Sequence, residues 1–389
     1  MKRENVKMSV QSFEVHIPDT ILHDLHERLA HTRWPDEIPD TGWDYGTNLD
    51  YLKELVDYWH YKFNWHEQEV KLNKFSQFKT LVDGVNIHFI HMRGKCANPL
   101  PIILTHGWPD SFYRFYKVIP MLTDPERFGG KAEDSFDVVI PSLPGFGFSS
   151  RMAMSDRAVA DLWAKLMIES LGYKKFMAAG GDLGSGVTKF LALKHPKVVA
   201  GIHLTDVGYP TGQEDFSALS EAEQQFVHLM QRWLFTEGAY ILIQTTKPQT
   251  LGYSLNDSPA GLASWIIEKF YSWSDCKGSI ENRFTKDELL TNIMIYWVTQ
   301  TINSSIRMYS ENARDTYVQN TSTNRYVRSQ IPAAVAAFPS DAPFPREWAE
   351  RNVNLKRWIK MPTGGHFAAL EEPELYVNDL REFFREFRE

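Results

Sequence analysis

The stretch Gly180-Gly181-Asp182-Leu183-Gly184 is the most informative part of this 389-residue chain for predicting its fold. It places one acidic residue among small ones, in the pattern of a tight turn. Residues 174–179 before it become apolar toward their end, as expected of a buried parallel strand. Residues 187–194 after it have helix-forming composition and stop before Pro196. Strand, glycine turn and helix are the context of a nucleophile elbow, whose apex residue has strained backbone dihedrals. We therefore expect Asp182 to project into a cleft above a sheet.

An aspartate at this position changes the chemistry that the elbow supports. A carboxylate can displace a leaving group at a saturated carbon and form an alkyl-enzyme ester, which water then hydrolyses. Epoxides and alkyl halides are substrates of this type. The five residues alone fit an ordinary Asx-turn or helix N-cap aspartate equally well, so other segments must decide between the two interpretations.

Two further segments follow in the chain order of a catalytic triad. Phe338-Pro339-Ser340-Asp341 places a carboxylate after an apolar run, and Gly364-Gly365-His366-Phe367 places a histidine in a glycine turn after a strand-like run. The order nucleophile, acid, histidine is that of an α/β-hydrolase. Asp206, at the end of another strand-like run, is a rival for the acid. Chain order favours Asp341.

An upstream turn predicts an oxyanion hole. Residues 101–105 have the composition of a buried strand and lead into His106-Gly107-Trp108-Pro109. The backbone N–H of Trp108, together with that of Leu183, would hold an oxyanion; a simple β-turn closed by Pro109 is the alternative. Residues 136–141 predict another strand, which ends at the loop 144–149. That loop is not a dinucleotide site, because position 150 is Ser150 and not the third glycine of the motif.

Together these segments resemble the epoxide hydrolases of the microsomal type within the α/β-hydrolase superfamily. The resemblance extends through nearly the whole chain, including residues 13–36, and the Phe-Pro-x-acid match adds to the case for Asp341. In that family two lid tyrosines hold and protonate the epoxide oxygen. Residues 237–244 and 304–309 resemble the segments that carry them, which implies Tyr240 and Tyr309. A phenol with a pKa near ~10 can donate to an alkoxide without being ionised at neutral pH.

The resemblance also implies a two-step reaction without a cofactor. Asp182 would attack a small apolar epoxide, and His366, oriented by Asp341, would activate water to release a vicinal diol. A haloalkane dehalogenase and a non-catalytic binding protein of the same fold are the alternatives. Leu183 counts against the dehalogenase, since such enzymes commonly use an indole at that position. The complete triad counts against a binding protein.

Composition excludes several other classes of protein. The net charge of −7 and the absence of Lys/Arg runs interleaved with aromatics argue against nucleic acid as a partner. Cysteines and histidines do not cluster at metal-ligand spacing. No run approaches the ~18 apolar residues of a membrane span, and the charged residues 1–7 do not form a secretory signal. With two cysteines, these features lead us to expect a soluble cytoplasmic protein. A homodimer remains open.

The chain divides into four predicted parts. Residues 1–95 form an N-terminal region, 96–207 and 328–389 form the two parts of a hydrolase core, and 208–327 form a helical lid. Helices are predicted over 19–31, 48–63, 156–171, 222–237 and 286–308. The expected architecture is an α/β-hydrolase fold with a mostly parallel central sheet, a helical lid insertion and an N-terminal extension.

Overall fold

A computed structural model describes residues 10–212, 214–320 and 328–388 of the chain. The charged start at residues 1–7 and the predicted lid boundary at 327 lie outside the described residues. Within them, strands form one sheet in the order β1-β2-β3-β5-β4-β6-β7-β8-β9. The strands are β1 (Gln11–Phe13), β2 (Gln77–Val82), β3 (Val85–Met92), β4 (Leu100–Thr105), β5 (Phe136–Pro141), β6 (Phe176–Gly180), β7 (Val199–Leu204), β8 (Pro332–Ala337) and β9 (Asn354–Lys360).

The sheet is antiparallel at its N-terminal edge and parallel elsewhere. β1, β2, β3 and β5 pair antiparallel in succession, and every pairing from β5 through β4, β6, β7 and β8 to β9 is parallel. All residues of β5, β6 and β7 are buried. Strands covered on both faces read as continuous apolar runs, which is why these segments were recognisable in the sequence.

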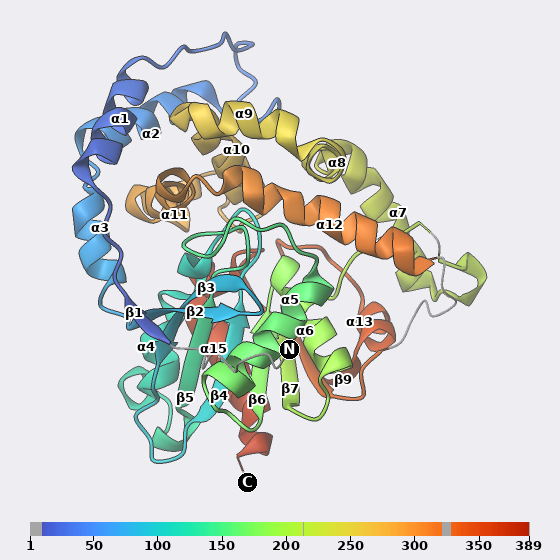
Figure 1. Cartoon of the computed structure of the whole chain (residues 1–389). Coiled ribbons are helices and arrows are strands. Elements are labelled where there is room, and N and C mark those ends of the chain that lie inside the picture. The colour runs from blue at the N-terminus through green and yellow to red at the C-terminus, as the bar shows by residue number, and fades with distance from the viewer. Residues whose placement is uncertain (1–9, 213, 321–327, 389) are drawn as a thin grey trace, which may run out of the picture.

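Helices cover both faces of the sheet and form a separate layer above it (Figure 1). The N-terminal helices are α1 (Asp19–Ala30), α2 (Leu49–Tyr61) and α3 (Trp65–Leu72). The core helices are α4 (Val118–Thr123), α5 (Asp156–Lys165), α6 (Leu183–Lys194), α13 (Arg346–Asn352), α14 (Ala368–Glu371) and α15 (Pro373–Phe384). The lid helices are α7 (Glu221–Thr236), α8 (Ala239–Thr246), α9 (Pro248–Asp257), α10 (Pro259–Ser272), α11 (Lys286–Thr299) and α12 (Ile302–Asn320). None of the helices within the described ranges has the length and hydropathy needed to span a bilayer.

Local side-chain caps mark where the helices of the lid and core begin. Ser220 and Glu223 form a capping box at α7, and Thr285 and Glu288 form one at α11. Ser155 accepts from the N–H of Ala158 at the start of α5. Each cap satisfies a backbone N–H that has no partner inside the helix, and this explains why the predicted helix starts lie within one residue of those observed.

The single helix predicted over residues 286–308 is wrong, because the structure divides it into α11 and α12. Gln300 has φ +52° and ends α11 in the left-handed conformation. The N–H groups of Gln300 and Thr301 bond to the carbonyls of Trp297 and Tyr296, the pattern that closes a helix C-terminus. The segments on both sides favour helix. No glycine or proline stands between them, so the sequence does not mark the position where α11 ends.

The N-terminal region contains more structure than the two predicted helices. Besides α1 and α2 it contributes α3 and the strands β1–β3, so it extends the central sheet directly. Its helices pack along one side of the lid (Figure 1). The indole N–H of Trp59 on α2 contacts the sulfur of Met294 on α11 at 3.3 Å, and the hydroxyl of Tyr58 donates to Asp287 at 2.9 Å. The lid is therefore supported by the N-terminal region.

Candidate active site

Asp182 lies at the turn between β6 and α6 with φ +56° and ψ −132°. Such a conformation costs an aspartate about 1–3 kcal/mol. Small neighbours make the turn possible, since a Cβ atom at Gly181 would lie 2.5 Å from the Thr205 hydroxyl. At Gly184 a Cβ atom would overlap the carbonyl oxygen of Thr105 on β4. The glycines thus allow α6 to start close to the sheet and hold Asp182 at the apex.

His366 lies between two carboxylates. Its Nε2 is 3.3 Å from Asp182 Oδ2, and its Nδ1 is 3.2 Å from Asp341 Oδ1. The histidine follows β9 in a loop anchored to the lid, because its N–H donates to the carbonyl of Trp273 at 2.8 Å. Burial alone would lower the pKa of His366, but the charges of Asp341 and Asp182 raise it to about 10. The imidazole is therefore a cation at neutral pH.

The rival carboxyl group, Asp206, has different partners. Its Oδ1 accepts from the N–H of Gly208 at 2.6 Å. Burial, together with the negative charge of Asp341, raises the pKa of Asp206 to about 6. Among the described residues, the carboxylates in ion-pair contact with the His366 ring are Asp182 and Asp341, so the structure brings Asp341 and not Asp206 to the histidine.

The two predicted oxyanion donors lie in the turns that follow β4 and β6. The N–H of Trp108 donates to Asp182 Oδ1 at 2.9 Å. Leu183 is the first residue of α6, so its N–H has no acceptor within the helix. Both donors belong to backbone held by regular structure on either side.

Tyr240 on α8 and Tyr309 on α12 meet above this site. Their ring centroids are 6.0 Å apart, and both rings contact the indole of Trp108, at 5.4 and 6.1 Å. Tyr240 is buried and Tyr309 is half-buried. Burial, reinforced by the negative charge of Asp182, raises the pKa of both phenols well above the ordinary value. Both hydroxyls therefore keep their protons across the physiological range.

A cavity of about 400 Å³ borders Asp182, Tyr240, Asp341 and His366. Its walls are Asp182, Tyr209, Leu229, Met230, Arg232, Trp233, Thr236, Glu237, Tyr240, Ser272, Trp273, Ser340, Asp341, Ala342, Pro343 and His366. A larger hollow, about 670 Å³, lies between α2, α3 and α11, but it contains none of the predicted site residues. The smaller cavity is the one where a nucleophile, a base and a proton donor converge.

Sequence reasoning did not find Trp273 or Arg114. The Trp273 ring lies 5.1 Å from the rings of both His366 and Tyr240, and Arg114 donates to the His366 carbonyl. The aromatic content of the lid was the only sequence signal for Trp273. No local pattern points to Arg114, since its partner lies 252 residues away. Within the described residues, no cluster of His, Cys, Asp or Glu could hold a metal ion.

Comparison with known proteins assigns this site to a family. The profile of the family "Epoxide hydrolase N terminus" matches residues 10–115, and that of "alpha/beta hydrolase fold" matches residues 101–237. Epoxide hydrolase 1 of Sus scrofa is 38% identical over 413 residues, which cover 96% of this chain and 88% of the relative.

Solved structures agree with the sequence relatives. The crystal structure of juvenile hormone epoxide hydrolase from the silkworm Bombyx mori is 30% identical, with a TM-score of 0.86, and the match covers 98% of this chain and 95% of that one. An epoxide hydrolase from Aspergillus niger is 28% identical, with a TM-score of 0.82, over 98% and 97% of the two chains. The predicted fold and family are confirmed: the chain belongs to the epoxide hydrolases of the α/β-hydrolase superfamily and is an epoxide hydrolase.

Proposed function

We propose that Asp182 is the nucleophile of this epoxide hydrolase and that Tyr240 and Tyr309 are its proton donors. One carboxylate oxygen of Asp182 attacks an epoxide carbon, and the ring C–O bond breaks with its electron pair on oxygen. That oxygen takes a proton from a tyrosine hydroxyl. The position of Asp182 in the cavity wall below Tyr240 supports this step, as does the contact of both phenol rings with Trp108.

In the second step His366 acts as the base. It takes a proton from water, whose oxygen attacks the carbonyl carbon of the Asp182 ester, while the N–H groups of Trp108 and Leu183 hold the oxyanion. The tetrahedral intermediate then expels the diol oxygen, which takes the proton back from His366. The proton that remains on the Asp182 carboxyl group passes to His366, which restores the starting imidazolium and carboxylate. Asp341 orients the imidazole and stabilises its cation.

Ester formation itself prepares the base. The charge of Asp182 is one of the two that raise the pKa of His366, and esterification removes that charge. The pKa of His366 therefore falls once the first step is complete. The imidazolium then gives up its proton, which returns to the tyrosinate left by the first step, and the neutral imidazole can accept a proton from water.

The single observation that carries this proposal is His366 in contact with both Asp182 and Asp341 at the wall of a cavity roofed by Tyr240. The test is the intact mass of the H366Q variant mixed with styrene oxide, followed by peptide mapping. The expected result is the added mass of one epoxide, located on Asp182. The double variant H366Q/D182N is the matched control and should gain no mass. An adduct on another residue would contradict the assignment.

The cavity supports a small, largely apolar epoxide as the substrate, since Leu229, Met230, Trp233 and Pro343 are among its walls. Water is the second reactant and the mechanism needs no cofactor. We also propose that the chain divides into four parts, with boundaries at residues 95, 207 and 327.

The protein's compartment is the last part of the proposal. The free cysteines Cys96 and Cys276 support a reducing compartment such as the cytoplasm.

A further inference from the structure

A buried ion pair that has no role in the reaction steps above lies beneath the catalytic residues. Arg114, in the 3₁₀ turn Phe112–Phe115, donates from Nη1 to Oδ2 of Asp110, and each residue is 2% exposed. Burying two charges costs several kcal/mol per ion, which only good geometry and further hydrogen bonds offset. The remaining contacts of the two side chains therefore indicate what the pair does.

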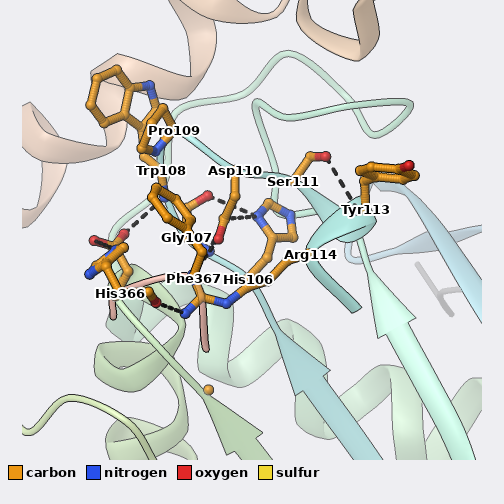
Figure 2. A network of polar contacts seen from close by, with 12 residues as sticks. His106, Gly107, Trp108, Pro109, Asp110, Ser111, Tyr113, Arg114, His366 and Phe367 are labelled. Atoms are coloured by element: carbon orange, nitrogen blue, oxygen red, sulfur yellow. Dashed lines mark hydrogen bonds and ion pairs between the residues drawn. The ribbon is translucent and has the colours of Figure 1, made fainter. Parts of the chain in front are cut away.

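Arg114 reaches the loop of the catalytic histidine. Its second terminal nitrogen, Nη2, donates to the backbone carbonyl of His366, as Figure 2 shows. The same nitrogen would lie 2.7 Å from a Cβ atom at Gly181, so the guanidinium also packs against the glycine that precedes Asp182. One side chain thus touches the histidine loop and the elbow together.

Asp110 holds the loop that carries the oxyanion donor. Its Oδ1 accepts from the N–H of Gly107 at 2.8 Å, one residue before Trp108, whose own N–H contacts Asp182. Helix α11 secures the same loop from the lid side, since Asn292 donates to the carbonyl of Pro109 at 2.8 Å. The Asp110–Arg114 pair therefore joins the Trp108 loop to His366 through direct hydrogen bonds.

We propose that Arg114, held by Asp110, is a positioning residue for the second half-reaction. The inference rests on the proposed function, because it assumes that His366 activates water and that the Trp108 N–H holds the oxyanion. Both groups must be placed together against the ester carbon, and a displacement of about 1 Å can cost ~10²-fold in rate. The proton donors of the first half-reaction, Tyr240 and Tyr309, lie on lid helices α8 and α12, whereas the side chain of Arg114 donates to Asp110 and to the His366 carbonyl.

This role predicts a particular kinetic signature. For a reaction with irreversible alkylation, kcat/KM reports the steps up to ester formation, while kcat reports the slower of the two chemical steps. Impaired ester hydrolysis lowers kcat and KM by the same factor and leaves kcat/KM close to the wild-type value. The ester then accumulates during turnover. A general loss of folded structure lowers the apparent kcat and kcat/KM together, leaves KM unchanged and accumulates no ester.

The experiment compares R114M, R114K and the double variant D110N/R114M with wild-type enzyme, using styrene oxide, steady-state kinetics and rapid-quench mass spectrometry. R114M should lower kcat and KM together by about 10- to 100-fold and accumulate ester on Asp182. R114K, which keeps the charge, should restore part of the rate. The double variant removes both charges, which avoids an unpaired buried carboxylate, and it should keep the hydrolysis defect.

Arg381 provides the matched control. It is also 2% exposed and donates to a backbone carbonyl, that of Met121 at 2.6 Å, away from the cavity. R381M should lose stability without accumulating ester. The inference is overturned if kcat/KM of R114M falls as far as kcat with no added ester, or if R381M accumulates ester on Asp182 as R114M does. If R114M does not fold, R114K and the double variant decide. Failure of wild-type enzyme to form any ester on Asp182 would instead overturn the proposed function.

Discussion

Asp341 and Asp206 are the two acidic residues considered for the triad, and they differ in what they contact. Asp341 meets the ring nitrogen at 3.2 Å, whereas Asp206 accepts from the linker N–H of Gly208. We expect D341N to slow hydrolysis of the trapped ester by roughly 10²- to 10⁴-fold, because the amide no longer stabilises the imidazolium. D206N should change this rate far less. Single-turnover decay of the ester measures the hydrolysis rate in both variants. Equal rates in D341N and D206N would contradict the assignment of Asp341 as the acid of the triad.

The pKa of His366 provides a second test at the residue scale. Asp341 and Asp182 raise it to about 10 against the effect of burial. The D182N variant replaces one carboxylate by a neutral amide, as the ester does, and should lower the pKa of the imidazole. Below its pKa the ring is protonated and cannot accept a proton from water, so ester hydrolysis should accelerate as pH rises through the lowered value. Histidine ¹⁵N NMR titration of wild-type and D182N protein measures the shift; an unchanged pKa would contradict it.

At the scale of elements, the site depends on how closely α6 approaches β4. Gly184 lies where a Cβ atom would overlap backbone, the carbonyl oxygen of Thr105, which cannot rotate away. We expect G184A to reduce the free energy of unfolding by about 1–3 kcal/mol and to lower activity, because α6 also carries Leu183.

Gly261 on α10 is the matched helical glycine for this prediction. A Cβ atom there would lie 3.2 Å from the Ser258 side chain, which is the nearest neighbour. The free energy of unfolding of G261A should therefore lie within about 0.5 kcal/mol of the wild-type value, as is usual for substitutions outside the packed core. Urea denaturation of both variants provides the comparison, and equal stability of G184A and G261A would show that α6 can move away from β4.

At the scale of the whole molecule, the N-terminal region, core and lid share one hydrophobic core. Trp59 of α2, Ile103 of β4 and Met294 of α11 belong to the same buried cluster. We expect a single cooperative unfolding transition, with far-UV circular dichroism and tryptophan fluorescence coinciding in urea. W59A should lower the midpoint of that whole transition, at a cost of about 3–5 kcal/mol. A separate early transition in W59A would show that the N-terminal region unfolds independently.

Local patterns were sufficient for a large part of the protein. The elbow at 180–184, the buried parallel strands β4 to β8 and the capped starts of α7 and α11 were predictable, because each depends on neighbours within a few residues. The chain order of Asp182, Asp341 and His366 and the family motifs pointed to the same chemistry, since order along the chain reflects how the fold connects its strands. The sequence by itself therefore determined the fold class, the family and the candidate nucleophile.

Only the tertiary structure decided which distant groups meet. The break at Gln300 arises from a left-handed residue between two helix-favouring segments. The contact of Asp341 with His366 depends on where two loops end at one edge of the sheet. Arg114 contacts the carbonyl of a residue 252 positions later, and no spacing rule connects them. Such contacts are determined by how complete elements pack, and packing depends on the shape of the whole core rather than on any one stretch of sequence.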